Sequence, residues 1–342
     1  MTRMEREIFE TPELLRAAIP AYAEALVPAA GAVRGRMLRA VVFAGRGSSD
    51  NAGIYFKYLT ETHAALPVAF AAPSVVTLYG AAPDLSDKLV VAASQSGQAA
   101  DVAAVLALAR RQGAVTVALT NDPESPVARS SDHPLDLRMG REESVAATKT
   151  FTAELLGLGM LSALLAADRA LEAALKTVPA AIERVLSQRP AIEREAVRLR
   201  DMASCFVLAR GFHLAVAFEL ALKLQESCYV RAHAYSLPDF QHGPFALAER
   251  DALFILLAPS GKTMPDSLAM VAKLDAVGAR ILAFTDDATL PVSHKVVLPK
   301  VDEEIAPFVL TIASQLFACA LSTVRGNDPD APRGLKKITV TL

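Results

Sequence analysis

Three charged side chains lie at helical spacing in the second half of the sequence. Lys223 follows Glu219 by four residues and precedes Glu226 by three, so all three share one face of the helix predicted over 218–229. Further along, His242 stands in a loop bounded by proline and glycine. A carboxylate near an imidazole can transfer protons, because both groups can be tuned toward neutral pH. On spacing alone, such charged pairs are usually surface salt bridges, and a histidine in such a loop is more often structural than catalytic.

Two loops that follow predicted strands are rich in hydroxyl groups. In the loop 94–98 (SQSGQ), hydroxyls, amides, backbone N–H groups and the positive end of the next helix suit an anion, best a phosphate monoester. A plain turn with a helix cap is the alternative. The loop 45–49 (GRGSS) matches neither the P-loop nor the dinucleotide-binding pattern, so nucleotide binding is disfavoured. Two such loops suit a sugar phosphate, and Arg46 could pair with the phosphate or form an ordinary salt bridge.

Two further polar segments are candidates. The segment 143–150 (ESVAATKT) precedes a long apolar stretch, and we expect Lys149 to be a solvated residue at the start of a helix. The tail 328–342 is rich in Asp, Pro and Gly, and its lysines, Lys336 and Lys337, are expected to face solvent on composition alone. A lysine folded into a dry pocket could instead attack a carbonyl carbon.

An internal repeat predicts the elements that position these loops. Apolar runs of strand length alternate with helix-length segments, which is typical of parallel α/β sheets. Three runs recur at offsets of 165, 164 and 165 residues: 40–47 with 205–211, 88–97 with 252–261, and 113–122 with 278–287. We therefore predict two tandem doubly wound parallel-sheet domains, at 36–185 and 195–342, after a helical lead over 1–35. Ligands bind beyond the carboxyl ends of strands in such sheets, where the polar loops lie.

Composition excludes several classes of function. The chain has 342 residues, with 35 Lys plus Arg against 37 Asp plus Glu, so its net charge of −2 disfavours nucleic acid or an anionic membrane as partner. An apolar fraction of 52% excludes a disordered chain. The apolar stretch 155–167 is too short to span a bilayer, and no secretory signal is recognised at the start. The three cysteines form no metal or disulfide pattern, which predicts reduced thiols in a cytoplasmic protein: Cys205, Cys228 and Cys319.

Six segments in this order resemble the sugar isomerase (SIS) family. They are 47–49 (GSS), 94–97 (SQSG), 145–149 (VAATK), 221–226 (ALKLQE), 242–244 (HGP) and 332–337 (PRGLKK). The resemblance covers the chain from about residue 40 onward. Within the family the chain resembles the isomerase half of the glutamine-fructose-6-phosphate aminotransferases and, in its SVAATK segment, the SIS-type glucosamine-6-phosphate deaminases.

The resemblance implies a role for each matched residue. The phosphate would be held by Ser49, Ser94, Gln95 and Ser96, and sugar hydroxyls by Ser48 and the backbone near Val145. Glu226 would move a proton between C1 and C2, with Lys223 in the same substrate site. His242 would open the sugar ring across a homodimer interface, and Lys337 would form an imine with the ketose. No metal or other cofactor is implied. Ala99 and Ala147 depart from the pattern, since the aminotransferases have threonine and serine there.

The expected function follows from how the chain begins. The aminotransferases carry an N-terminal glutaminase domain with a cysteine after the initiator methionine, whereas this sequence has Thr2 and a short helical lead. We therefore expect an isomerising glucosamine-6-phosphate deaminase that converts glucosamine 6-phosphate into fructose 6-phosphate and ammonia. One alternative is an ammonia-dependent synthase or a deglycase. Another is a non-catalytic sugar-phosphate-sensing regulator, which would not need Glu226, His242 and Lys337 together.

Overall fold

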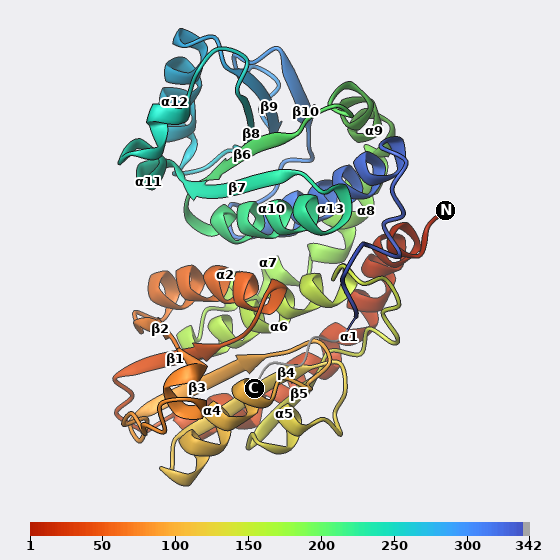
Figure 1. Cartoon of the computed structure of the whole chain (residues 1–342). Helices are drawn as coiled ribbons and strands as arrows, with labels where there is room; N and C mark the ends of the chain where they lie inside the picture. Colours follow the sequence, from red (N-terminus) through yellow and green to blue (C-terminus); the bar gives the residue numbers. More distant parts are fainter. Residues whose placement is uncertain (338–342) are drawn as a thin grey trace. The chain divides into compact units, whose positions relative to one another are not determined.

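The computed structural model describes residues 1–337 (Figure 1). The chain forms two compact units. The N-terminal unit comprises Glu13–Glu142, Lys149–Thr177 and, among the described residues of the tail, Lys336 and Lys337. The C-terminal unit comprises Met1–Pro12, Glu143–Thr148 and Val178–Leu335. The short segment 143–148 therefore belongs to the C-terminal unit although the first repeat surrounds it in the sequence.

The N-terminal unit contains a five-stranded parallel sheet in the order β2-β1-β3-β4-β5. Its strands are β1 (Ala40–Ala44), β2 (Val68–Phe70), β3 (Lys88–Ala93), β4 (Val115–Thr120) and β5 (His133–Asp136). Inner strands β3 and β4 are buried on both faces except for the partly exposed Lys88, as expected for strands covered by helices on both sides.

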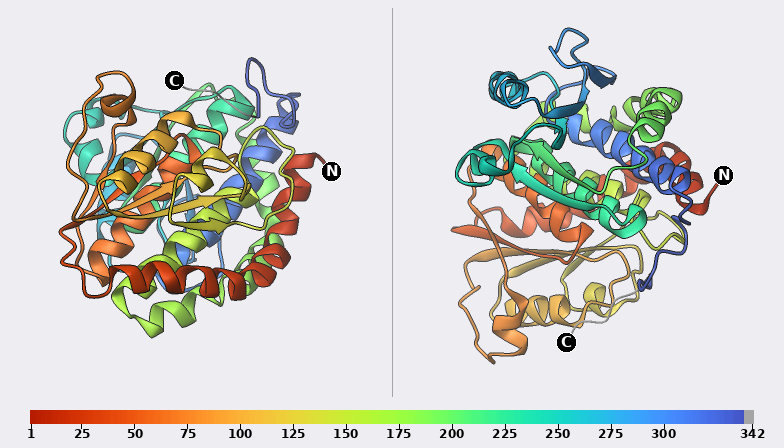
Figure 2. Two further views of the ribbon diagram at one scale, coloured as in Figure 1. Left: turned by 90° about the horizontal axis from the view of Figure 1, so that it is seen from below. Right: turned by 45° about the horizontal axis from the view of Figure 1, so that its top comes forward.

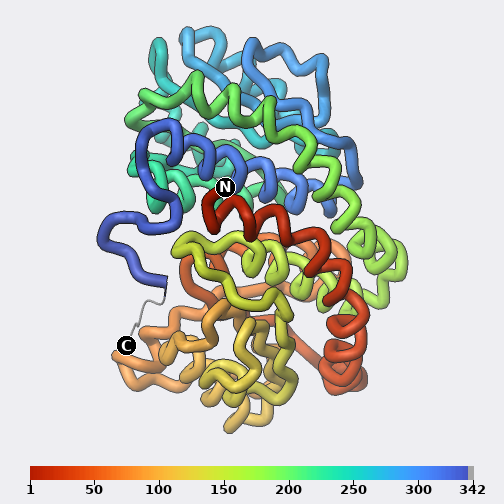
Figure 3. Tube along the Cα trace, turned by 90° about the vertical axis from the view of Figure 1, so that its right-hand side faces the viewer, coloured from red at the N-terminus to blue at the C-terminus, as the bar shows by residue number. Residues whose placement is uncertain are grey.

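Helices cover both faces of this sheet. They are α1 (Arg3–Val33), which begins in the C-terminal unit, α2 (Ser48–His63), α3 (Pro73–Thr77), α4 (Ala100–Arg111), α5 (Pro126–Arg129), α6 (Lys149–Ala166) and α7 (Arg169–Leu175). Figure 3 shows α1 as one continuous red helix at the start of the chain. Helices α2 and α6 lie on one face and α4 and α5 on the other (Figure 1). Gly157 lets α6 approach the sheet closely, since a Cβ there would lie 2.9 Å from the side chains of Leu119 and Leu135.

The C-terminal unit repeats this sheet, with strand order β7-β6-β8-β9-β10. Its strands are β6 (Ser204–Ala209), β7 (Arg231–Ser236), β8 (Leu253–Leu257), β9 (Arg280–Thr285) and β10 (His294–Val297). Its helical elements are α8 (Val178–Leu186), α9 (Arg189–Arg198), η1 (Gly211–His213), α10 (Leu214–Cys228), α11 (Leu237–Gln241), η2 (Pro244–Leu247), α12 (Met264–Ala276) and α13 (Ala306–Val324).

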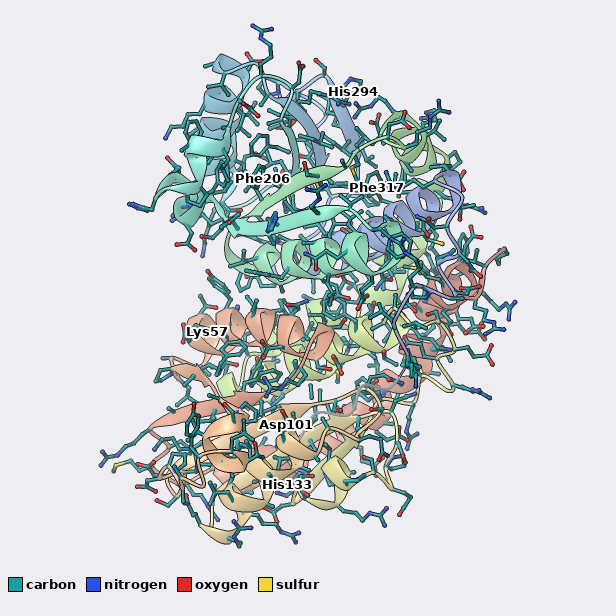
Figure 4. The ribbon with its side chains drawn as sticks, viewed as in Figure 1. Lys57, Asp101, His133, Phe206, His294 and Phe317 are labelled. Carbon is teal, nitrogen blue, oxygen red and sulfur yellow. The ribbon has the colours of Figure 1, made fainter. Side chains whose placement is uncertain are left out.

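Packing in the C-terminal unit separates two helical layers. Helices α10 and α13 lie side by side on one face of the sheet, whereas α11 and α12 pack on the other (Figures 1 and 2). On the α11 face, the rings of Phe206 and Phe254 stack with centroids 5.2 Å apart. On the α13 face, Phe317 contacts Phe284 at 5.8 Å; Figure 4 labels Phe206 and Phe317. Helix α10 itself packs against α13, β6 and β7.

The two sheets confirm the predicted fold class of two tandem doubly wound α/β domains. The repeat extends to an ion pair that the backbone pattern alone does not require. Arg46 pairs with Asp101 at the start of α4, with Nη2 and Oδ2 2.6 Å apart. The equivalent residues in the second repeat, Arg210 and Asp266, pair at the start of α12, with Nη1 and Oδ2 2.5 Å apart. The structure thus shows that Arg46 forms a salt bridge, one of the two roles considered for it.

Two apolar helices bear on the question of a membrane. Helices α6 and α13 are long and apolar enough to pass a composition test for membrane spans. Most of each helix is buried inside the protein, as in the core helices of soluble proteins. Length and composition are therefore weak grounds for assigning either helix to a membrane.

Candidate functional site

Helix α10 carries a buried lysine between two carboxylates. Lys223 Nζ lies 2.6 Å from Glu226 Oε2 and 3.2 Å from Glu219 Oε1. The side chains of Lys223 and Glu219 are 1% and 2% exposed, whereas that of Glu226 is 22% exposed. The predicted shared face is therefore confirmed, but the surface-salt-bridge interpretation is wrong. Lysine and glutamate are rarely buried unless paired, and here they are paired with each other.

The electrostatics of this triad keep the lysine charged. Burial alone would lower the pKa of Lys223, but the charges and hydrogen bonds of Glu219 and Glu226 raise it above its ordinary value of 10.5. The result is a fixed ammonium that orients a partly exposed carboxylate. Glu226 is thus the one of the three positioned to meet a ligand, and a held carboxylate of this kind can act as a general base.

The loop 94–98 joins β3 to α4 in a tight conformation. The Ser94 N–H donates to the Leu119 carbonyl at 3.0 Å, which holds the loop against the end of β4. Gly97 has φ +64°, and a Cβ there would lie 2.0 Å from Ser125 Oγ, so only glycine fits. Ala99 occupies the N-cap of α4 without a side-chain hydrogen bond. The departure from threonine therefore leaves the start of α4 without a hydroxyl cap.

Gln95 and Ser96 complete this loop. Both are partly exposed, and Ser96 Oγ accepts a hydrogen bond from the Gln98 N–H at 3.3 Å. Within residues 1–337, the N–H groups of Gln95 and Ser96 make no hydrogen bond to the protein. Together with the N-terminus of α4, these donors form an arrangement suited to an anion.

The equivalent loop of the second repeat is arranged differently. By the repeat, Ser260 and Lys262 correspond to Ser96 and Gln98. The Ser260 N–H donates to Asp286 Oδ1 at 2.6 Å, and the Lys262 N–H donates to Glu303 Oε2 at 3.1 Å. A Cβ at the intervening glycine would lie 2.5 Å from the Glu303 carboxyl carbon. Carboxylates of the chain itself thus bind the N–H groups of this second loop.

The two serines of the first hydroxyl loop lie at the start of α2. Ser48 is its first residue and is half-buried. Ser49 is buried, and its Oγ donates to Glu154 Oε1 on α6 at 2.8 Å. The Ser49 hydroxyl is therefore engaged by a carboxylate in this structure, and its assignment to a phosphate stays a prediction.

The segment around Val145 connects the end of the first sheet to α6. Val145 and Ala147 are half-buried in irregular backbone. Lys149, the first residue of α6, is only 3% exposed, so the expectation of a solvated helix-start lysine is wrong. The helix that follows is buried almost throughout, and its first turn is buried with it.

The C-terminal tail is attached at two points, each within one unit. In the C-terminal unit, the Arg333 guanidinium stacks on the Tyr229 ring at 3.9 Å, directly after α10. In the N-terminal unit, Lys337 Nζ lies 2.5 Å from Oε2 of Glu142, whose side chain is fully buried. Glu142 also accepts hydrogen bonds from the N–H and the hydroxyl of Thr150, at 3.1 and 2.8 Å. Lys336 is exposed as predicted, whereas Lys337 is ion-paired, and residues 338–342 lie outside the described chain.

His242 ends α11 on the surface of the C-terminal unit. It is exposed, and the following Gly243 has φ +127°, a conformation that favours glycine. In the described part of the chain, its imidazole forms no hydrogen bond, either to Glu226 or to another residue. The structure therefore does not join His242 to Glu226 within one chain.

Comparison with known proteins identifies the family. The SIS domain model matches residues 38–164 and 198–325, one match for each sheet. The chain belongs to the SIS family. The glutamine-fructose-6-phosphate aminotransferase of Pyrococcus horikoshii is 34% identical over 98% of this chain, which covers 57% of that relative. This SIS chain therefore spans a little over half the length of the curated relative.

Solved structures resemble this SIS chain over nearly its full length. The C-terminal domain of glucosamine-fructose-6-phosphate aminotransferase from Francisella tularensis is 27% identical, with a TM-score of 0.89 and coverage of 97% and 98% of the two chains. A Silicibacter pomeroyi DSS-3 protein, provisionally named a phosphosugar isomerase, is 34% identical, with a TM-score of 0.86 and coverage of 96% and 100%. A glucosamine-6-phosphate deaminase from Thermotoga maritima, 24% identical with a TM-score of 0.77 and coverage of 99% and 100%, shares the fold.

Proposed function

We propose that this chain is an isomerising glucosamine-6-phosphate deaminase, which converts glucosamine 6-phosphate and water into fructose 6-phosphate and ammonia. The observation that carries the proposal is the triad on α10. A buried ammonium, Lys223, holds the partly exposed carboxylate of Glu226 at 2.6 Å and so orients a group that can shuttle a proton between two carbons. The relatives named above act in amino-sugar and sugar-phosphate chemistry by their names, which supports a substrate of that class.

The phosphate is assigned to the loop 94–98. Its N–H groups and the N-terminus of α4 provide an anion site in the first repeat, with Ser94, Gln95 and Ser96 as further donors. The equivalent loop of the second repeat is occupied by Asp286 and Glu303, which favours the first loop as the phosphate site. Ser48, Ser49 and the backbone near Val145 complete the proposed contacts to the sugar phosphate.

The reaction divides into four steps. His242 promotes opening of the sugar ring by proton transfer, which exposes the C1 aldehyde. Glu226 then removes the C2 proton and returns it to C1, while a proton of the amino group moves to O1, so that the amino aldose becomes the imine of the ketose. Water adds to C2 of this imine, and the C–N bond breaks to release ammonia and fructose 6-phosphate. Lys223 keeps the Glu226 carboxylate oriented throughout.

Lys337 supplies an amine near the end of the chain. An ammonium cannot attack a carbonyl carbon, so Lys337 must give up a proton before its amine adds to C2 of the ketose product, fructose 6-phosphate. The adduct then loses water to form the imine. Glu142 is the group within reach of that proton, with Oε2 at 2.5 Å. In the proposed mechanism, Glu142 accepts this proton and returns it when the imine is hydrolysed.

A second copy of the chain is part of the proposal. His242 is exposed and forms no hydrogen bond to Glu226 within the described part of one chain. A homodimer in which His242 enters the partner's site would give the imidazole a substrate to act on. We also propose that the protein is cytoplasmic, because its three cysteines are free thiols and thiols stay reduced in that compartment.

The direction of the reaction follows from mass action. In the proposed reaction ammonia is exchanged with solvent, so low ammonia favours its release and high ammonia favours synthesis of the amino sugar. The test is incubation of the protein with glucosamine 6-phosphate, with ammonia and fructose 6-phosphate assayed together. We expect equal amounts of both products, and none from the variant Glu226→Gln. Binding without either product would instead favour a sugar-phosphate sensor.

A further inference from the structure

A carboxylate at the start of the chain holds the segment 143–148. Glu7 on α1 accepts hydrogen bonds from the N–H groups of Glu143 and Ser144, the latter at 3.2 Å, and from the hydroxyl of Ser144. Thr148 Oγ1 lies 3.4 Å from the same carboxylate. Glu7 is 4% exposed, and the serine and threonine are fully buried. All of these residues belong to the C-terminal unit.

This contact is a satisfied buried charge. Burial of a carboxylate is costly unless hydrogen-bond donors replace the water that it loses. Glu7 meets donors from both backbone and side chains, 136 and 137 residues away in the sequence. On α13, Gln315 Nε2 donates to the Thr148 carbonyl at 3.1 Å. The segment is thus attached to α1 and to α13.

The start of α1 is itself anchored. The carboxylate of Asp330 accepts hydrogen bonds from the N–H groups of Arg3 and Met4, at 2.7 and 2.8 Å. These are orphan donors of the first turn of α1, so Asp330 caps the helix. Glu5 pairs with Arg189 of α9, with Oε1 and Nη2 2.5 Å apart. Glu7 therefore acts from a fixed helix rather than from a free terminus.

We propose that Glu7 is a positioning residue, which fixes the backbone around Val145 in the shape that meets the sugar hydroxyls. The inference rests on the proposed function only for the identity of the ligand. Val145 lies one residue beyond Ser144, so loss of the two Ser144 contacts frees the backbone directly beside it. A shift of about 1 Å in a group that orients substrate can lower the rate by about a hundredfold.

The variant Glu7→Gln keeps the size of the side chain but places an NH2 group against N–H and O–H donors. We expect this variant to weaken binding of fructose 6-phosphate by about tenfold, equivalent to loss of one hydrogen bond to a charged group. Binding of inorganic phosphate should not change, because the loop 94–98 belongs to the other unit. Glu13→Gln is the matched control, since Glu13 is an exposed glutamate on the same helix.

The experiment combines hydrogen exchange with binding. Hydrogen–deuterium exchange of the Glu143 and Ser144 amides should be faster in Glu7→Gln than in wild type or Glu13→Gln. Titration with fructose 6-phosphate and with inorganic phosphate should show a loss for the sugar phosphate alone. Unchanged exchange would show that Glu7 does not hold the segment 143–148 and would refute the proposal. Faster exchange with unchanged sugar-phosphate affinity would refute the positioning role. An equal loss for both ligands would indicate general destabilisation and also refute it.

The binding readout separates this inference from the proposed function. If wild-type protein binds fructose 6-phosphate but turns over no amino-hexose phosphate, the proposed function fails and the effect of Glu7→Gln on affinity is still decisive. The double variant Glu7→Gln, Ser144→Ala adds a further check. We expect it to bind fructose 6-phosphate about as weakly as Glu7→Gln alone, because both changes remove the same contact. Additive losses would contradict a shared contact.

Discussion

Replacement of Lys223 by methionine tests the triad on α10. The Lys223 ammonium lies 3.2 Å from Glu219 and 2.6 Å from Glu226, and Glu219 is only 2% exposed. Removal of one partner of a buried ion pair leaves the other charge in a medium of low dielectric, at a cost of about 3–5 kcal/mol. Glu226 is 22% exposed, and solvent screening limits the contribution of its pair with Lys223 to about 1 kcal/mol or less of the free energy of unfolding. The free energy of unfolding of Lys223→Met should therefore fall by about 3–5 kcal/mol.

The control removes the stranded charge as well. In the double variant Lys223→Met, Glu219→Gln the buried carboxylate that lost its cation is gone as well, so we expect recovery of at least about 2 kcal/mol. Urea unfolding followed by far-ultraviolet circular dichroism measures the free energy of unfolding of both variants, since the chain has no tryptophan for fluorescence. A loss below about 1 kcal/mol in the single variant would refute the reasoning. So would a double variant no more stable than the single one.

Three further predictions concern other buried groups. Burial lowers the pKa of His213 to about 3 from 6.5, so the unfolded chain binds more protons between these values and stability rises with pH there. The free energy of unfolding should fall by about 2 kcal/mol between pH 7 and pH 5. Urea titrations of His213→Leu should no longer show this fall, and an unchanged pH dependence in the variant would contradict the prediction. Glu142→Gln should reduce borohydride trapping of fructose 6-phosphate on Lys337 by roughly tenfold or more, measured by mass spectrometry. Trapping in the variant at the same level as in wild type would exclude Glu142 as the proton acceptor. Burial raises the pKa of three thiols, to about 12 for Cys205 and Cys228 and about 11 for Cys319, so a thiol reagent at pH 8 should label them only after denaturation. Rapid labelling of native protein would contradict their burial.

The internal repeat made the fold predictable. Offsets near 165 residues aligned apolar runs that became β1 and β6, β3 and β8, and β4 and β9. The same offset also relates Arg46 to Arg210 and Asp101 to Asp266, which form equivalent ion pairs. The sequence of the single loop left both roles open for Arg46, and this correspondence was not used to choose between them.

The burial of charged groups was not predictable from spacing. Helical spacing placed Glu219, Lys223 and Glu226 on one face but could not show that this face is buried. For Lys149 the same limitation gave a wrong expectation, because a lysine at a helix start is usually solvated. In both cases tertiary packing of long apolar helices decided exposure.

Long-range contacts escaped the sequence altogether. Glu7 contacts residues 136 and 137 positions away, and Glu142 contacts Lys337 across 195 positions. No periodicity or local motif links such residues. The acidic pair at 142–143 recurs in the repeat at 303–304, which could have drawn attention to Glu142 but not to its partner.

The central claim is that Glu226 moves a proton between C1 and C2 of a hexose phosphate. The most direct measurement is nuclear magnetic resonance of fructose 6-phosphate incubated with the protein and an ammonium salt in heavy water. We predict deuterium incorporation at C1 with wild-type protein and none above background with Glu226→Gln, while both proteins bind the sugar phosphate. Incorporation at the wild-type rate by Glu226→Gln, or none by wild type, would contradict the account.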